Sequence, residues 1–210
     1  MLTCLEIPAK ETERGVIIWL HGLGADGSDL EPLAQMLNLP QLRHILPDAP
    51  VRPVTVNGGM AMRAWYDIAG ANILAAAEDS SGMIASAEAV AALAAGKVRP
   101  GTPLLVIGFS QGAVIALILG LTMLPEVTGI GVLSGYMPRF LHNESWRKPA
   151  LFMAHGSGDT VILPAWGQAS RDRLEQEGCP VRWREYPMAH AICAEELEDL
   201  ALWIQNTLDL

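Results

Sequence analysis

The chain has 210 residues, of which 50% are hydrophobic and 18% are charged, and its formal net charge is −9 at pH 7. The hydrophobic content excludes a disordered chain, and the acidic charge disfavours nucleic acid as a partner, because phosphate binding needs a basic surface. No apolar run reaches the roughly 18–20 residues of a membrane-spanning helix. The first residues lack the basic and apolar regions of a signal peptide, so we expect a cytoplasmic protein.

Short β-like runs, several of them almost wholly apolar, predict seven strands, and the longer segments between them predict five helices. The predicted strands are Cys4–Ile7, Val16–Leu20, Arg43–Leu46, Leu104–Ile107, Ile130–Leu133, Leu151–Ala154 and Val181–Tyr186. The predicted helices are about Ser28–Leu37, Ser81–Ala95, Gln111–Leu121, Pro164–Gln176 and Ala194–Leu208. This alternation indicates one three-layer α/β domain over residues 1–210, with a mostly parallel sheet covered on both faces.

Two segments depart from the alternation. Lys10–Gly15 joins the first two strands and is too short for a crossover helix, so we expect these strands to pair antiparallel at one edge. Pro47–Ala76 is a long excursion after the third strand. Because ligands bind at the carboxyl ends of strands in α/β sheets, we expect this excursion to contribute to a functional site.

The segment Leu104–Ala113 has the pattern of a buried strand, a tight turn and the start of a helix, and Ser110 lies in the turn between Gly108 and Gly112. Glycines at these positions let the strand and the helix approach closely, which forces the serine side chain outward. The N–H of Gln111 then lies at a helix N-terminus, where it can donate to a developing negative charge. The alternative is an ordinary strand–helix connection with an incidental serine.

A serine nucleophile needs a base, which is usually a histidine held by a carboxylate. Three histidines follow Ser110, namely His142, His155 and His190. His190 follows the last predicted strand, so it lies at the same edge of the sheet as Ser110. His142 lies in a polar segment, and His155 precedes the candidate acid, whereas α/β hydrolases place the histidine after the acid. The sequence therefore predicts His190 as the base.

Asp159 is the candidate acid, because it lies in a glycine-rich turn directly after the sixth predicted strand. The later acidic residues Asp172, Glu175 and Glu177 fall on a polar helix and are typical of a solvated face. The alternative for Asp159 is a structural aspartate that caps a turn or the next helix.

The segment His21–Gly27 follows the second strand and contains three glycines. Such a loop can direct the N–H of Leu23 at the same oxygen as the N–H of Gln111, which would complete an oxyanion hole. The glycines also resemble a dinucleotide-binding motif, but their spacing does not match it. We expect His21 to shape this loop through hydrogen bonds rather than to carry a proton.

These motifs together resemble the carboxylesterase, lysophospholipase and acyl-protein thioesterase family of small α/β hydrolases. The segments that carry the likeness, in chain order, are His21–Gly24, Pro47–Pro50, Pro53–Thr55, Asn57–Gly59, Met62–Ile68, Gly108–Ala113, His155–Gly156 with Asp159, and Tyr186–His190. The resemblance implies an α/β-hydrolase fold of about seven strands with an antiparallel edge and no large lid. It also implies Ser110 as nucleophile, Asp159 as orienting acid, His190 as base, and Leu23 and Gln111 as oxyanion donors.

The sequence shows three departures from the family pattern. Ala113 and Ala189 stand where many members have glycine, and both changes are tolerable if the backbone there is not left-handed. Asp29 and Leu30 stand where an aromatic residue is common, which changes one wall of the expected acyl pocket.

Apolar residues near the predicted site are candidates for substrate binding, with ordinary core packing as the alternative. They are Met60, Met62, Trp65, Ile68, Val161, Ile162 and Met188. We hypothesise hydrolysis of small-molecule carboxylic esters with short to medium acyl chains, lysophospholipid-like esters included, without a metal or cofactor. The alternatives are hydrolysis of protein or small thioesters by the same machinery, and a non-catalytic ligand-binding protein on this fold. We expect a monomer or a weak homodimer.

Overall fold

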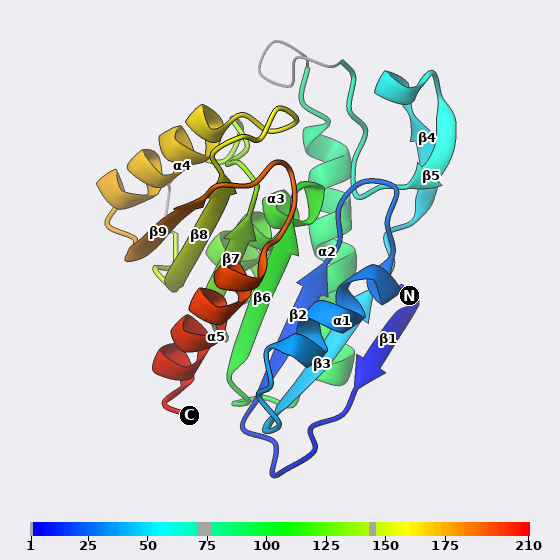
Figure 1. The fold of residues 1–210 in the computed structure, drawn as a ribbon. Coiled ribbons are helices and arrows are strands. Elements are labelled where there is room, and N and C mark those ends of the chain that lie inside the picture. The colour runs from blue at the N-terminus through cyan, green and yellow to red at the C-terminus, as the bar shows by residue number, and fades with distance from the viewer. Residues whose placement is uncertain (1, 71–76, 143–145) are drawn as a thin grey trace.

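The structure is a computed structural model that describes residues 2–70, 77–142 and 146–210. A seven-stranded sheet lies between two layers of helices (Figure 1). All neighbouring strands are parallel except β1 and β3, and the order across the sheet is β1-β3-β2-β6-β7-β8-β9. The strands are β1 (Cys4–Ile7), β2 (Gly15–Leu20), β3 (Leu42–Pro47), β6 (Leu104–Phe109), β7 (Val127–Leu133), β8 (Ala150–Gly156) and β9 (Val181–Tyr186).

The helices cover both faces of the sheet, as the apolar strands require. They are α1 (Glu31–Met36), α2 (Ser80–Lys97), α3 (Gln111–Ile118), α4 (Pro164–Gln176) and α5 (Ala194–Leu208). In Figure 1, α1 and α5 lie in front of the sheet, and α2 and α3 lie behind it. The predicted three-layer α/β-hydrolase architecture is confirmed.

Strand β2 shows how the two faces are filled. Its side chains alternate between two hydrophobic clusters: Ile17 and Trp19 pack with α1 and α5, whereas Val16 and Ile18 pack with α2 and α3. Every residue of β2 is buried, because the strand has a neighbour on each edge and helices on both faces. The carboxyl end of β2 therefore lies between neighbouring strands in the interior of the sheet, and not at an outer edge.

The antiparallel edge exists, but its predicted partner was wrong. Strand β1 pairs with β3, in the register Cys4↔Pro47, and not with β2. Both edges of β2 are already occupied by the parallel strands β3 and β6, so β1 pairs at the free outer edge of β3. The short connection Lys10–Gly15 spans the width of one intervening strand.

Two helix boundaries also differ from the prediction. The first helix is divided into a 3₁₀ turn, Gly27–Leu30, and α1, because Pro32 has no N–H to donate to the carbonyl of Ser28. Asp26 caps the 3₁₀ turn by accepting from the N–H of Ser28 at 2.8 Å. The third helix ends at Ile118 and continues as a π-helical turn, Leu119–Met123.

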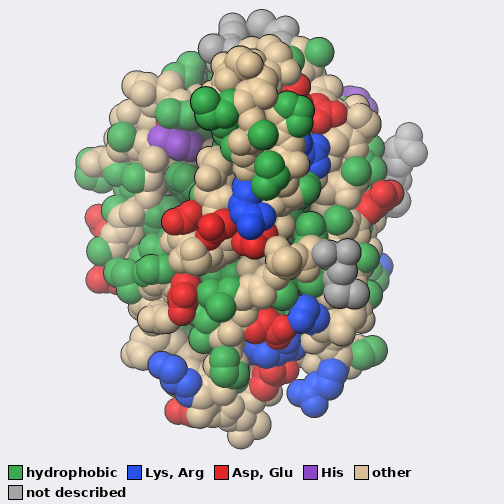
Figure 2. Space-filling view, turned by 90° about the vertical axis from the view of Figure 1, so that its right-hand side faces the viewer, with side chains coloured by type: hydrophobic (Ala, Val, Ile, Leu, Met, Phe, Trp, Pro, Cys, Tyr) green, Lys and Arg blue, Asp and Glu red, His purple; other side chains and the backbone are tan. Residues whose placement is uncertain are grey.

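The excursion Pro47–Ala76 contains an antiparallel hairpin that was not predicted, formed by β4 (Val51–Val54) and β5 (Met60–Arg63). The final residues of the excursion, 71–76, lie outside the described residues. The hairpin stands apart from the main sheet, and Val51 and Met60 are both 64% exposed. Figure 2 shows this side of the molecule, where exposed hydrophobic side chains lie above a region in which acidic and basic side chains are neighbours.

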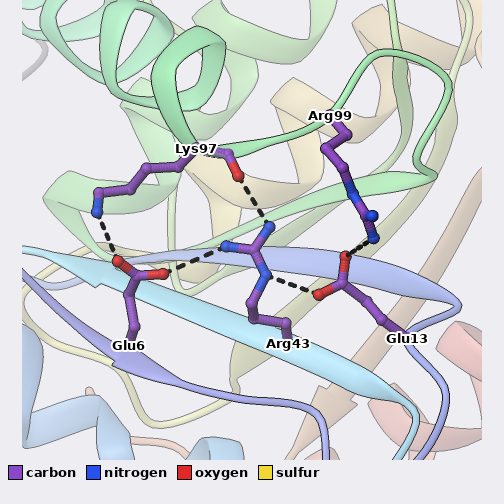
Figure 3. A network of polar contacts seen from close by, with 5 residues as sticks. All are labelled: Glu6, Glu13, Arg43, Lys97 and Arg99. Carbon is purple, nitrogen blue, oxygen red and sulfur yellow. Dashed lines mark hydrogen bonds and ion pairs between the residues drawn. The ribbon is translucent and has the colours of Figure 1, made fainter.

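A network of five charged residues lies at the amino ends of β2 and β3 (Figure 3). Arg43 on β3 is its centre and contacts Glu13 at 2.8 Å and Glu6 at 3.3 Å. Lys97 at the end of α2 pairs with Glu6, and Arg99 pairs with Glu13 at 3.4 Å. The guanidinium of Arg43 also donates to the main-chain oxygen of Lys97 at 2.9 Å. The network therefore joins β1, β3, the end of α2 and the loop before β2.

None of the described helices is both long enough and apolar enough to cross a membrane.

Candidate active site

Ser110 lies on the sharp turn between β6 and α3. Its backbone has φ +53° and ψ −117°, a conformation that non-glycine residues seldom adopt. The N–H of Ser110 donates to the carbonyl of Leu133 on the neighbouring strand at 2.9 Å, which fixes the turn to the sheet. Backbone strain of this kind persists only where the surrounding structure enforces it, and it directs the side chain out of the sheet.

The two flanking glycines explain how the turn is enforced. A Cβ on Gly112 would lie 2.1 Å from the carbonyl oxygen of Leu20, and a Cβ on Gly108 would lie 2.3 Å from the carbonyl carbon of Gly112. Helix α3 therefore packs directly against the main chain of β2 and β6. No other residue fits at either position without moving the backbone.

The structure brings Ser110, His190 and Asp159 together from the ends of three strands. The Oγ of Ser110 is 2.9 Å from Nε2 of His190, and Nδ1 of His190 is 2.7 Å from Oδ2 of Asp159. Because a carboxylate only accepts hydrogen bonds, Nδ1 carries the imidazole proton and Nε2 is left to accept the serine proton. The ring of Phe109 packs against the imidazole, with centroids 4.8 Å apart.

Asp159 is held rigidly within its turn. Its side chain is fully buried, and Oδ1 accepts from the N–H groups of Val161 and Ile162 at 2.8 and 2.9 Å. Nε2 of His155 lies 2.8 Å from the carbonyl of Ile162 and 3.5 Å from Oδ2 of Asp159. His155 thus closes the turn that carries the acid, a contact that the sequence analysis missed.

The two predicted oxyanion donors face the same space as the serine. Leu23 and Gln111 both line the cavity that contains Ser110. Neither the N–H of Leu23 nor that of Gln111 donates a hydrogen bond within the part of the chain that the structure describes. Gly22 packs against Ser110, since a Cβ there would lie 3.5 Å from the serine Cβ. The loop and the serine turn are therefore in direct contact.

His21 is a structural residue, as predicted. It is fully buried, its Nε2 accepts from the N–H of Ala49 at 3.0 Å, and its Nδ1 is therefore protonated and donates to the carbonyl of Gly22 at 2.7 Å. Burial lowers the pKa of the imidazole below its usual range. His21 consequently stays neutral and connects the glycine loop to the segment after β3.

The cavity beside Ser110 has a volume of about 530 Å³ and a mostly apolar wall. This size is typical of small-molecule sites. Residues of three predicted functional segments meet here: Leu23, Ser110 with Gln111, and His190. The other residues that line it are His21, Gly22, Ala25, Asp29, Leu30, Leu33, Tyr66, Ile68, Phe109, Tyr136, Val161, Ile162, Ala191 and Ile192.

The predicted substrate-binding residues divide into two groups. Ile68, Val161 and Ile162 line the cavity, whereas Met60, Met62, Trp65 and Met188 do not. This second part of the prediction needs correction. Met60 and Met62 lie on the β4–β5 hairpin, Trp65 is fully buried, and Met188 packs partly buried against the cluster beneath α5.

Several cavity residues were not predicted, because they lie in elements whose pattern indicates core packing. Tyr66 and Tyr136 form one wall, with their hydroxyl oxygens 3.2 Å apart. Burial raises the pKa of both phenols, so both hydroxyls remain protonated and polar within an otherwise apolar wall. Leu33, on α1, forms another part of the wall.

The departures from the family pattern have direct structural outcomes. Neither Ala113 nor Ala189 has a positive φ, so both are accommodated. The methyl group of Ala113 occupies a space that only a glycine at 135 leaves open, because a Cβ on Gly135 would lie 2.5 Å from it. Asp29 and Leu30 both line the cavity, so the change at these positions does alter the pocket wall.

Among the described residues, no group of three or more histidine, cysteine, aspartate or glutamate side chains could hold a metal ion. The cysteines Cys4, Cys179 and Cys193 are free thiols.

Comparison with known proteins is consistent with this geometry. A family model described as Phospholipase/Carboxylesterase matches residues 3–208. The chain is 34% identical to acyl-protein thioesterase 1 of Mycosarcoma maydis, over 91% of this chain and 90% of that protein. It is 34% identical to a probable carboxylesterase of Oryza sativa subsp. japonica, over 95% of this chain and 80% of that protein. The crystal structure of Zea mays acyl-protein thioesterase 2 is similar with a TM-score of 0.90 and 32% identity, covering 99% of this chain and 100% of that one.

Proposed function

Because the chain belongs to the phospholipase/carboxylesterase family, we propose that it is a serine hydrolase that cleaves carboxylic esters of short to medium acyl chains, lysophospholipid-like esters included. The observation that carries the proposal is the unbroken chain of hydrogen bonds from Asp159 through His190 to Ser110, which opens into an apolar cavity. This arrangement supplies a nucleophile, a base and a held acid.

The reaction proceeds in two stages. The Oγ of Ser110 attacks the carbonyl carbon of the ester, its proton passes to Nε2 of His190, and the carbonyl oxygen becomes an anion that accepts from the N–H groups of Leu23 and Gln111. Collapse of this intermediate expels the alcohol, which takes the proton from His190. A water molecule, deprotonated by His190, then attacks the acyl-enzyme, and collapse of this second intermediate returns the proton from His190 to the Oγ of Ser110 and releases the acid.

Thioesters are the second candidate substrate class. The favouring observation is that the similar proteins from Mycosarcoma maydis and Zea mays are named acyl-protein thioesterases. The same residues would cleave a thioester, with a thiol as the leaving group in place of the alcohol.

We expect the enzyme to act in the cytoplasm, as one domain over residues 1–210 and as a monomer or weak homodimer. The free thiols suit a reducing compartment. The net charge of −9 disfavours nucleic acid as a partner.

A direct test measures turnover of p-nitrophenyl esters of increasing acyl length beside acyl thioesters of the same chain lengths. We expect turnover of both classes by the wild type and none above background by Ser110→Ala. Equal rates for the wild type and Ser110→Ala would overturn the proposed function and favour a non-catalytic binding protein. The ratio of kcat/KM between the matched esters and thioesters decides between the two substrate classes.

A further inference from the structure

Trp65 is hydrogen-bonded to both segments that would supply the oxyanion donors, although it does not line the cavity. Its side chain is fully buried. The indole Nε1 donates to the carbonyl of His21 at 2.9 Å, and the indole lies against the imidazole of His21 with ring centroids 5.2 Å apart. That carbonyl is two residues before Leu23, so the indole fixes the start of the first donor loop.

The main chain of Trp65 is in turn held by the second donor residue. The side chain of Gln111 is buried, its Oε1 accepts from the N–H of Trp65 at 2.8 Å, and its Nε2 donates to the carbonyl of Tyr66 at 2.7 Å. Gln111 therefore has two roles that use different atoms. Its backbone N–H is the proposed oxyanion donor beside the cavity that Gln111 lines, and its side-chain amide binds the segment that carries the indole.

Further contacts complete the connection. The N–H of Gly24 donates to the carbonyl of Arg63 at 2.8 Å, so the first loop is attached to this segment on both sides of Leu23. The hydroxyl of Ser86 on α2 donates to the carbonyl of Trp65. Every polar main-chain and side-chain atom of Trp65 is therefore hydrogen-bonded, so the residue is fixed in one position.

We propose that Trp65 is a positioning residue that sets the N–H of Leu23 relative to the N–H of Gln111. The inference rests on the proposed function. Transition-state stabilisation by such donors depends on their being fixed before the reaction, and a displacement of about 1 Å can cost on the order of 100-fold in rate. The indole N–H is the only group of Trp65 that reaches the first loop by a hydrogen bond within the described chain.

Trp65→Phe tests the proposal, because it keeps a buried aromatic ring and removes the N–H. We expect kcat to fall by about 10- to 100-fold with KM within about threefold of the wild-type value. We also expect weaker inhibition by an alkyl trifluoromethyl ketone, in proportion to the loss of kcat/KM. Ser110 adds to this ketone, its proton passes to His190, and the ketone oxygen becomes an anion in the oxyanion hole. Inhibition by the corresponding methyl ketone, which stays a carbonyl compound, should be unchanged.

Trp19→Phe is the matched control. Trp19 is also buried, and its Nε1 also donates a hydrogen bond, to Nδ1 of His44 at 3.0 Å, but on the opposite face of the sheet. We expect it to lower the melting temperature about as much as Trp65→Phe and to leave kcat unchanged.

Gln111→Met is the second test variant, because it keeps the N–H of residue 111 and removes both side-chain hydrogen bonds. We expect the kinetic pattern of Trp65→Phe.

The outcomes separate the inference from the function on which it rests. The inference alone is overturned if the wild type turns over esters while Trp65→Phe and Gln111→Met both keep wild-type kcat and wild-type affinity for the trifluoromethyl ketone. Equal kinetic losses in Trp65→Phe and Trp19→Phe would also overturn it, since stability alone would then explain the effect. A wild type without turnover would remove the proposed function and the inference together.

Discussion

The two ends of the sheet use polar groups in opposite ways. At the carboxyl ends of the strands, Asp159 is fully buried and its oxygens accept from His190 and from two backbone N–H groups. At the amino ends, the charged network around Arg43 is partly open to solvent, and the side chain of Arg99 is 79% exposed. The catalytic acid at the first end is therefore closed off from solvent, whereas part of the charged network at the second end is open to it.

The exact positions of polar groups matter more at the buried carboxyl end of the sheet than at the partly exposed amino end. In a buried site the effective dielectric constant is low, so a fixed dipole or charge acts strongly and a small displacement is costly. An exposed ion pair is screened by water and salt, and it contributes about 0–1 kcal/mol. We therefore expect changes at the carboxyl end to affect catalysis most, and changes at the amino end to affect only stability.

The largest effect is expected from Ser110→Ala and His190→Ala at the carboxyl end. Each should lower kcat for a p-nitrophenyl ester by about 10⁴-fold or more, and the double variant should be no worse than the single ones, because these residues act as a unit. Steady-state kinetics on purified variants, with the concentration of folded protein determined for each, measures the effect. Additive losses in the double variant would contradict the proposed coupling of Ser110 and His190.

Two helical glycines, one at each end, give the next comparison. Gly112→Ala places a Cβ against the carbonyl of Leu20, so we expect unfolding in urea to show a loss of about 3 kcal/mol, together with lost activity. Gly96→Ala in α2 meets no atom within 4 Å, and it should raise stability by about 0.5–1 kcal/mol without changing kcat. Effects of the same sign at both positions would show that backbone packing does not distinguish the ends.

Buried titratable groups near the two ends should respond to pH in opposite directions. Burial raises the pKa of Glu196, in the first turn of α5, from 4.5 to about 8, and the nearby N–H of Cys193 only partly offsets this. The contribution of Glu196 to the free energy of unfolding is therefore complete below pH 4.5 and is lost as the pH rises to about 8. We expect the free energy of unfolding to fall by about 2 kcal/mol between pH 6 and pH 8.

Glu196→Gln should abolish most of that alkaline loss, as measured by urea unfolding at the two pH values. An unchanged slope in this variant would rule out Glu196 as the cause.

His44 on β3 should change the free energy of unfolding with pH in the opposite direction, since burial lowers its pKa from 6.5 to about 4. Its contribution is complete above pH 6.5 and is lost as pH falls to about 4, so acid destabilisation in that window should be absent in His44→Asn.

The smallest effect is expected at the charged network. Arg43→Met removes the contacts to Glu6, Glu13 and the carbonyl of Lys97, and we expect a loss of about 1 kcal/mol that shrinks in 1 M salt. The value of kcat should stay within about twofold of the wild type. A large kinetic defect in this variant would break the distinction between the two ends.

The sequence predicted the carboxyl end better than the amino end, for a physical reason. Ser110, Asp159 and His190 each follow a predicted strand, and the carboxyl ends of parallel strands meet at one edge of the sheet, so chain order alone places them together. The partner of β1 could not be deduced in this way, because it depends on which edge of the sheet is free.

The substrate pocket was predicted least well. Met60, Met62 and Trp65 were expected in the cavity because they are apolar and lie in the excursion after β3. Met60 and Met62 instead lie on a hairpin that no periodicity in the sequence encodes, and Trp65 is buried just after it. The hydrogen bonds of Trp65 and Gln111 are equally invisible in the sequence, since they join segments 46 residues apart.

Intact-protein mass spectrometry with an alkyl fluorophosphonate tests directly whether Ser110 is the nucleophile. We expect the wild type to gain the mass of one phosphonyl group, mapped to Ser110 by peptide analysis, and Ser110→Ala to gain none. Labelling of Ser110→Ala to the same extent, or an unlabelled wild type, would contradict this role of Ser110.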